Sequence, residues 1–395
     1  MPRNKWESIK KNLHFVDNES KCDDSPKGFK FLPLIKNFND VCGKISMDEM
    51  LAVDEQIIPT KTKRSRLRQY NPRKPKKWGY KMFLLTVSTG LLHNVEFYLA
   101  EKEMVDNDVG ASGSVVLRLS ERIPSGKNFK LFFDNWFSSV PLLRKLHSRQ
   151  IFSLSTVRIY RIPGLEFPSD KSMLKCNGRG AIVKKSATLP ATTDTVAAIK
   201  WLYNRGVILL SDFVSSSPMQ TIRRYSKKES TYKEIDCPSA IKQYNSFMGG
   251  IDSFDSFIAL YRIKIKSTKK FYLRIFLHFV DMAVVNSWLL YKRDCLDCSE
   301  TNTLSLWDLK AEIAECLCKA NKPAIKRRLS SSINTACIPC KDLRHDSLDH
   351  LPITKDLCGR CKLPSCKSRP NAFCIKCKLY LCISEKNCFL TFHTK

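Results

Sequence analysis

The chain has 395 residues, and its 43% hydrophobic and 10% aromatic content excludes a wholly disordered protein, because this much apolar side chain can form a core. Its 67 Lys and Arg against 38 Asp and Glu give a formal net charge of +29, far beyond what solubility requires. Such a charge predicts a polyanionic partner, most commonly nucleic acid, with an anionic membrane surface as the alternative.

The chain carries no pattern typical of secretion or of a membrane span. Its first fifteen residues are charged and amphipathic, unlike the apolar centre of a signal peptide. The longest apolar run, Phe271 to Tyr291, includes Arg274, His278 and Asp281, which predicts a buried helix. We therefore expect an intracellular, nuclear or nucleoid-associated protein with no membrane partner.

Local patterns predict a mixed α/β domain after a short helical segment. Residues 1–48 have helical spacing but are too few to make a core of their own. Alternation and turn signals then predict an antiparallel meander followed by crossover helices, which together give a mixed sheet covered by helices. The strands are expected at Leu51–Ile58, Tyr80–Val87, Leu91–Leu99, Phe129–Phe133 and Ile151–Arg158, and the helices at Ser114–Ile123 and Val140–Arg149.

The second half of the chain is less regular. Residues 160–235 are rich in Ser, Thr and Pro and are interpreted as an insertion, with strands near Ala181–Lys184, Val196–Trp201 and Val207–Leu210. Long helices are expected at Pro238–Tyr261 and Lys269–Lys292. The predicted organisation is a helical segment at 1–48, an α/β domain at 49–292, a helical linker at 293–335 and a cysteine-rich domain at 336–395.

A basic stretch lies between residues 61 and 81. It holds ten Lys and Arg and no acid, interleaved with Tyr70, Trp78 and Tyr80. Cations neutralise phosphates and aromatic rings stack on exposed bases, so the stretch predicts a nucleic-acid interface, with a solvated surface loop as the alternative. The residues assigned to DNA binding are Lys61, Lys63, Arg64, Arg66, Arg68, Arg73, Lys74, Lys76, Lys77, Trp78 and Lys81.

Three aspartates stand in contexts that suit a metal site. Asp54 lies inside an apolar strand, Asp134 ends another strand, and Asp252 lies in a helix with Asp255 one turn later. A buried carboxylate is costly unless it is paired or metal-bound, and phosphodiester chemistry needs oxygen ligands that hold one or two Mg²⁺ ions. Each aspartate alone is more often a cap, turn or salt-bridge residue, so the set gains weight from the strand order and the charge.

This strand order is that of a ribonuclease H-like fold, and the sequence around it resembles the piggyBac transposase family, above all its transposable element-derived members. The similarity rests on six collinear motifs that extend over nearly the whole chain. They are Val53–Gln56, Tyr70–Lys81, Pro124–Lys127, Phe132–Phe137, Tyr244–Asp252 and the terminal Cys/His cluster.

The resemblance implies both a site and a reaction. It places the family's metal-binding aspartates at Asp54, Asp134 and Asp252, and an additional catalytic aspartate at Asp255. It implies Mg²⁺- or Mn²⁺-dependent nicking of transposon ends by water, hairpin formation by the freed 3′-hydroxyl, and joining to TTAA target DNA. A homodimer in the nucleus that binds transposon-end DNA would follow from the same resemblance.

The region before the first aspartate departs from the family pattern. About 50 residues precede Asp54, and they resemble only the end of a helical dimerisation and DNA-binding domain. We therefore expect either a transposase or a domesticated or decayed derivative that binds DNA through its basic surface and zinc finger without transposing. A RING-type ubiquitin ligase ranks below both, because that activity would leave the embedded aspartates unexplained.

The C-terminal region is predicted to bind zinc. Of the 17 cysteines, 13 follow position 290, and clustered cysteines without a secretory signal are more often metal ligands than disulfides. Eight Cys and His ligands suffice for two closed tetrahedral Zn²⁺ sites. Because the ligand positions are interspersed with lysines, DNA is the expected partner of this finger, with a chromatin or peptide partner as the alternative.

The family resemblance implies a cross-brace finger, RING- or PHD-like, in which the ligands of the two ions interleave. The preferred pairing puts Cys358, Cys361, Cys377 and Cys382 on one ion, and Cys366, Cys374, Cys388 and His393 on the other. Cys337-x2-Cys340 followed by Cys358-x2-Cys361 is also a zinc-compatible spacing, so the first site has an alternative ligand set.

Overall fold

The computed structural model describes residues 2–60, 65, 67–72, 74, 76–99, 105–188, 195–226, 230–265, 270–320 and 338–394. The chain divides into two compact units, Met1–Ala314 and Glu315–Lys395, here called unit 1 and unit 2. The predicted mixed α/β fold is confirmed in unit 1, and the cysteine-rich region lies in unit 2.

The centre of unit 1 is a mixed sheet in which the first strand lies in the middle. β1 (Met50–Pro59) pairs antiparallel with β3 (Trp78–Val87) on one side and parallel with β5 (Lys130–Phe133) on the other. β4 (Leu92–Phe97) and the short β2 (Gln69–Tyr70) pair with β3, and β6 (Phe152–Thr156) runs parallel to β5. The order β4-β3-β1-β5-β6 is the ribonuclease H-like order that the sequence predicted.

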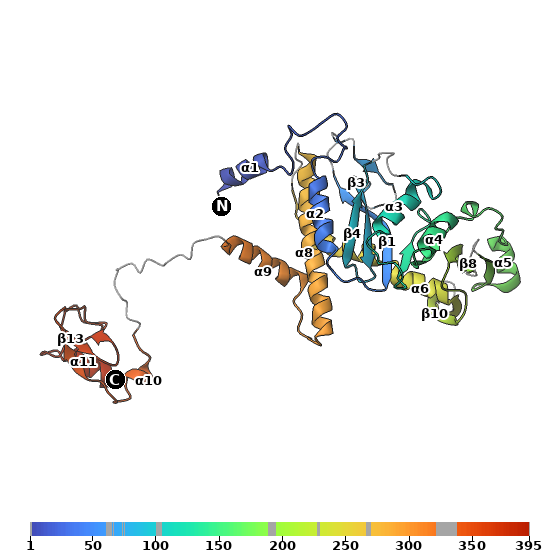
Figure 1. Cartoon of the computed structure of the whole chain (residues 1–395). Coiled ribbons are helices and arrows are strands. Elements are labelled where there is room, and N and C mark those ends of the chain that lie inside the picture. The colour runs from blue at the N-terminus through green and yellow to red at the C-terminus, as the bar shows by residue number, and fades with distance from the viewer. Residues whose placement is uncertain are drawn as a thin grey trace. The chain divides into compact units, whose positions relative to one another are not determined.

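The central strands are uniformly apolar because both faces of the sheet are covered. Leu51, Ala52 and Val53 of β1 and Phe132 and Phe133 of β5 are all fully buried. Figure 1 shows α2 (Leu32–Cys42) and α8 (Phe271–Asp297) on one side of the sheet, and α3 (Gly110–Ser120) and α4 (Val140–His147) on the other. A strand buried on both faces needs a continuous hydrophobic run, which is what these segments carry.

The region interpreted as an insertion extends the same sheet. β9 (Gly206–Ser211) pairs antiparallel with β6, and β8 (Thr195–Leu202) and β7 (Ile182–Thr188) follow outward in that order. The sequence located these strands but could not show that they join the central sheet, since strand pairing is not a local property. The rest of the region holds a 3₁₀ turn (Ile159–Arg161), α5 (Asp170–Asn177) and a separate hairpin of β10 (Met219–Ser226) and β11 (Thr231–Pro238).

The single helix expected at 238–261 is two helices. α6 (Ser239–Phe247) ends before Gly249, and α7 (Gly250–Leu260) begins directly after it. A Cβ on Gly250 would lie 2.2 Å from the carbonyl oxygen of Val87 and 2.6 Å from Thr86 Oγ1. Only glycine therefore allows the start of α7 to approach the end of β3 this closely.

α8 is the core helix of unit 1. By length and composition alone it could cross a membrane, but 56% of its most apolar window is buried within the fold. It also carries the buried polar residues His278, Asp281 and Asn286, each hydrogen-bonded to protein groups. The prediction of a buried helix is therefore confirmed, and the structure adds that its buried polar groups are hydrogen-bonded.

The helices at the two ends of unit 1 pack less completely. α1 (Arg3–Asn12) buries no residue, and its Trp6 and Ile9 are each 43% exposed. Phe15, just beyond α1, packs on Tyr272 and Phe276 of α8. The boundary between the two units falls within α9 (Leu306–Lys319).

Unit 2 has very little regular structure in its described part. It contains α10 (Lys341–Arg344), a sheet of β12 (Pro352–Thr354), β13 (Ala372–Cys374) and β14 (Leu379–Tyr380), and α11 (Cys388–Thr394). Its core consists of Leu379, Leu381 and Phe392 surrounded by buried cysteines. So small an apolar core is typical of domains that depend on metal ions or disulfides.

Replacing Gly250 with Ala should destabilise unit 1, because the new methyl group meets backbone rather than a movable side chain. Overpacking of this kind costs about 1–3 kcal/mol of unfolding free energy. Gly249→Ala is the matched control, since nothing lies within 4 Å of its added Cβ. Urea unfolding followed by tryptophan fluorescence measures both variants, and equal losses would contradict the close contact at Gly250.

Candidate functional site

The pairing of β1 with β5 brings two of the predicted aspartates together. Val53 of β1 is opposite Phe133 of β5 in a parallel register, so Asp54 and Asp134 come next on neighbouring strands. Both side chains are half-buried. Asp252 and Asp255 lie on α7, which packs on β1 and β3, with Asp252 exposed and Asp255 half-buried.

Burial dominates the electrostatics of the paired aspartates. Desolvation raises the pKa of Asp54 to about 7; the backbone N–H of Glu55, 2.7 Å from Asp54 Oδ1, opposes this shift, and the charge of Asp134 adds to it. Desolvation also raises the pKa of Asp134, although the backbone N–H of Trp136 donates to its Oδ1 at 2.7 Å. Two neighbouring carboxylates that resist ionisation form a donor set that a divalent cation would stabilise.

Asp255 is held by a buried relay that the sequence did not reveal. Gln56, fully buried on β1, donates from Nε2 to Asp255 Oδ1 at 2.6 Å, and its Oε1 lies 2.9 Å from His278 Nε2. Burial lowers the pKa of His278 to about 3, so its ring is neutral and Nε2 carries the proton that it donates to Gln56. One feature of the sequence could have indicated this contact. Gln56 is a polar residue two positions after Asp54, so the two side chains lie on the same face of the strand.

Glu55, next to Asp54, is paired with its neighbours. Lys81 Nζ lies 2.6 Å from Glu55 Oε2, and Asn71 Nδ2 donates to Oε1 at 2.9 Å. The Lys81 ammonium also lies over the Trp136 ring, 4.4 Å from its centroid. Lys81, predicted to bind DNA, is thus placed in an ion pair within the site.

Tyr244 of α6 is a further residue of the site. Burial raises the pKa of its hydroxyl to about 12, and the charges of Asp134 and Asp54 contribute to the shift. Its oxygen lies 3.5 Å from Thr156 Oγ1 at the end of β6. The phenol therefore stays protonated beside the two aspartates and can donate a hydrogen bond there.

The four aspartates do not close around a single point. Within the described part of the chain, two groups of His, Cys, Asp or Glu have ligand atoms all within 4.8 Å of one another, and both groups lie in unit 2. The strand pair and α7 thus supply carboxylates from two directions, an arrangement more open than a structural metal site.

The basic stretch is described in part. Lys61, Lys63, Arg64, Arg66 and Arg73 lie outside the described residues. The Arg68 guanidinium lies over the Trp78 ring, 3.9 Å from its centroid, and Tyr70 packs on the same ring. Tyr70 and Trp78 remain 52% and 43% exposed, so this cluster presents aromatic faces and cations together. The remaining described cations assigned to DNA binding are Lys74, Lys76 and Lys77.

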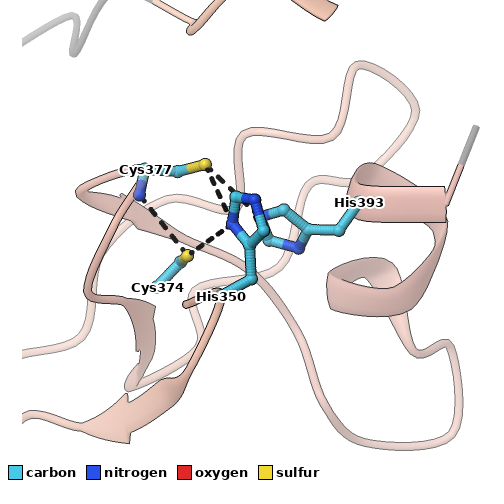
Figure 2. A group of neighbouring side chains, drawn as sticks. All are labelled: His350, Cys374, Cys377 and His393. Carbon is cyan, nitrogen blue, oxygen red and sulfur yellow. Dashed lines mark hydrogen bonds between the residues drawn. The ribbon is translucent and has the colours of Figure 1, made fainter. Parts of the chain in front are cut away.

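The first ligand group of unit 2 contains two histidines. Figure 2 shows His350, Cys374, Cys377 and His393 converging from separate segments. His350 Nδ1 lies 3.6 Å from both sulfurs, and His393 Nε2 lies 3.4 Å from Cys377 Sγ. The second group consists of four cysteines, Cys361, Cys366, Cys382 and Cys388.

The two groups differ from the pairing of ligands expected from the sequence, although they interleave as expected. Cys358 is exposed and belongs to neither group. His350 is a member of the first group, although it was not among the expected ligands. The reason is the pairing of β12 with β13, in which Pro352 is opposite Cys374, so that the chain just before β12 lies beside Cys374 and Cys377. His350 is remote in sequence from the paired cysteines, so ligand spacing did not identify it.

The alternative first site included Cys337, which lies outside the described residues. Its other N-terminal member, Cys340, is exposed and in neither group. Along the chain the two groups alternate as His350, then Cys361 and Cys366, then Cys374 and Cys377, then Cys382 and Cys388, then His393. This alternation is the order of a cross-brace, and thiolate and imidazole ligands in fours are the donor set of structural zinc.

Unit 1 is thus a ribonuclease H-like α/β protein with carboxylates gathered on its central parallel strand pair. Residues 1–288 match the family model described as Transposase IS4. The chain therefore belongs to this family, in its piggyBac-type branch, as the sequence motifs predicted.

The relatives include human proteins derived from transposable elements. PiggyBac transposable element-derived protein 3 of Homo sapiens is 30% identical over 298 residues, which are 74% of this chain and 48% of that protein. The human derived protein 2 is 26% identical over 368 residues, 91% of this chain and 59% of that protein. The chain thus spans about half the length of these relatives.

A solved structure of similar fold is that of a piggyBac transposase synaptic complex with hairpin DNA. Its TM-score is 0.64 at 19% identity, and the match covers 98% of this chain and 79% of that one. At this identity the similarity concerns the fold.

Replacing Asp54 with Asn should stabilise metal-free unit 1 at neutral pH. The pKa of Asp54 is about 7 in the folded chain, whereas an unfolded Asp has about 3.9. The folded state therefore binds more protons between these values, and stability contributed by protonated Asp54 is lost as the pH rises from about 4 to about 7. Because the variant lacks this loss, its advantage in melting temperature should grow over that range.

Tryptophan fluorescence measures this effect in unit 1 alone, because all six tryptophans precede residue 315. Added Mg²⁺ should stabilise the wild type more than the variant. A melting-temperature difference that stays constant from pH 4 to pH 7 would contradict the raised pKa.

Single substitutions in unit 2 should separate the observed grouping from the pairing expected by sequence. Native mass spectrometry of the full chain should count two zinc ions in the wild type and two in Cys358→Ser, whose thiol is in neither group. Cys361→Ser and His350→Ala should each lose one ion, because each removes a ligand from a different group. Loss of an ion from Cys358→Ser would restore the pairing that the sequence suggested.

Proposed function

We propose that this chain is a DNA transposase of piggyBac type, which cleaves transposon ends and transfers the freed strand to TTAA target sites. The observation that supports this most is the half-buried pair Asp54 and Asp134 on adjacent parallel strands, with both pKa values raised. A raised pKa at two neighbouring carboxylates means that their ionisation at neutral pH destabilises the metal-free fold. Strongly perturbed pKa values of this kind are typical of functional sites.

The proposed cofactor of unit 1 is Mg²⁺ or Mn²⁺. Asp54, Asp134 and Asp252 would hold it, because hard oxygen donors suit these ions. When bound, the metal supplies a nucleophile at neutral pH and stabilises the charge that develops on the phosphate.

The surrounding residues would fix the geometry of the reaction. Gln56 holds the Asp255 carboxylate in one orientation, so this fourth acid cannot swing away from the site. Tyr244 keeps its proton beside Asp54 and Asp134 and would orient a phosphate oxygen or a water molecule there. The ion pair between Lys81 and Glu55 prevents Glu55 from competing for the metal.

DNA is the proposed partner, and the nucleus is the proposed location. The net charge of +29 supports backbone neutralisation, and the cluster of half-buried Arg68 with exposed Tyr70 and Trp78 supports base stacking. Transposon ends bound by a homodimer, with two zinc ions in unit 2, complete this proposal. Unit 2 would add a second DNA contact, or bind a chromatin or peptide partner.

A domesticated derivative that binds DNA without transposing is the second candidate. The observation that favours it is that the human relatives are named as transposable element-derived proteins. The two candidates share the fold, the metals and the DNA surface, and they differ only in whether the aspartates perform chemistry.

Cleavage of end DNA tests the first candidate. With Mg²⁺ or Mn²⁺, the purified chain should nick duplex DNA taken from the genomic flanks of its coding sequence. Asp134→Asn should lower the rate by more than about 100-fold, since even residues that merely support metal ligands contribute 10–100-fold. Asp212→Asn is the matched control, another buried aspartate, which is bonded to Ser153 N and His147.

The outcome separates the two candidates. Cleavage that survives Asp134→Asn would refute the metal assignment. Tight DNA binding by a wild-type chain that never cleaves would favour the derivative.

A further inference from the structure

We infer that a cationic cavity beside Asp255 binds a backbone phosphate of the DNA strand on which the aspartates act. This inference rests on the proposed DNA-binding function but not on cleavage. The cavity has a volume of about 380 Å³ and opens between the end of β1, the loop before β3 and the start of α8. Its charged lining is Lys74, Lys76, Arg262, Lys264, Arg274 and Asp255.

The cavity has an excess of positive charge that the described chain does not neutralise. Five cationic side chains face one carboxylate, and that carboxylate, Asp255, is bonded to Gln56. Among the described residues, no ion-pair partner is found for Lys74, Lys76, Arg262, Lys264 or Arg274. Within the described part of the chain, the Nε of Arg262 is buried without a hydrogen-bond partner, and Arg274 donates only to the Ile265 carbonyl oxygen, at 3.0 Å.

The cations of the cavity repel one another. Partial desolvation lowers the pKa of Lys76, and repulsion from Arg262, Arg274 and Lys264 lowers it further. Burial lowers the pKa of Arg274, with repulsion from Arg262 as the second cause. Electrostatic repulsion makes this grouping of cations unfavourable, and an anion that binds between them would offset the repulsion.

The missing anion is not supplied by the neighbouring sequence. Residues 61–81 contain ten Lys and Arg and residues 262–270 contain five, and neither segment has an acid. Arginine forks and lysine ammonium groups together form the donor set that recognises phosphate oxygens. A buried guanidinium Nε without a partner is a donor that a phosphate oxygen would satisfy.

The position of the cavity favours a phosphate of the DNA backbone over a free ion. Ile57 and Pro59, which line it, follow Asp54 on β1. At about 3.3 Å per residue, Ile57 lies about 10 Å along the strand from Asp54, a distance that a few nucleotides of a DNA strand can span. Lys74 acts on both places, since its charge opposes the rise in pKa that burial causes at Asp54 and at Asp255.

A phosphate held in this cavity would fix the register of the strand. The scissile phosphate at Asp54 and Asp134 would then lie within about three nucleotides of an anchored phosphate, which restricts the approach of the reacting atoms. The five cavity cations thus have a role distinct from the Arg68, Tyr70 and Trp78 cluster, which presents an open stacking surface.

The first experiment compares DNA binding by two double variants of the full chain, in Ca²⁺ so that cleavage plays no part. Arg262→Gln with Lys264→Gln should reduce the slope of log affinity against log salt by about 0.9 to 1.8, the value for one to two lost phosphate contacts. Lys171→Gln with Lys175→Gln removes the same charge from exposed sites on α5 and should leave the slope unchanged. Equal changes in both double variants would overturn the proposal.

The second experiment locates the phosphate. Neutral methylphosphonates placed singly along the strand should weaken wild-type binding at one position within about three nucleotides of the expected cleavage point, and this effect should vanish in the cavity variant. If every position weakens both proteins alike, the cavity does not contact a backbone phosphate. Because binding alone is read, a chain that binds but never cleaves still tests this inference.

The third experiment separates a phosphate site from a structural role. Removing mutually repelling cations should leave the melting temperature of unit 1 without DNA unchanged or raised, by tryptophan fluorescence. A lower melting temperature in Arg262→Gln, together with an unaltered salt slope, would show that these residues support the fold instead.

Discussion

The parallel pairing of β1 with β5 is the constraint on which unit 1 depends. Its register sets Asp54 beside Asp134, and the fully buried residues before them hold the two strands in the middle of the sheet. The same position, between covered faces, removes water from the carboxylates and raises their pKa values. One hydrogen-bonded ladder therefore both builds the core and creates the strain that a metal ion would relieve.

Two regions of unlike charge adjoin along β1. The aspartates gather at its middle, and the cations of the cavity gather at its end. Gln56 lies between them, and its relay to His278 orients Asp255 without adding charge, because the imidazole is neutral. Each region is unfavourable alone, whereas a metal ion and a nucleic-acid strand bound together would satisfy both, so the two ligands should favour one another.

Unit 2 is organised differently, because its Cys and His side chains converge in two groups and its apolar core is small. Its two groups alternate along the chain, so each tightly bound ion would fix segments on both sides of the other group. β12 is the element that completes the first group, because its pairing with β13 brings His350 to Cys374 and Cys377. A domain with so few buried apolar side chains would take much of its folding free energy from such bonds.

The sequence by itself indicated where the main strands and helices lie and which aspartates are candidates for the site. Apolar runs located β1, β5 and α8, and motif order identified Asp54 and Asp134, since both signals are local and survive in a linear reading. Tertiary structure decided which distant residues meet. Pairing of β9 with β6, the partnership of Gln56 with His278, the ligand His350 and the gathering of Arg262 and Arg274 beside Asp255 all depend on strand registers and helix packing. Those contacts join segments whose own patterns carry no information about one another, because pairing energy belongs to the pair and not to either segment.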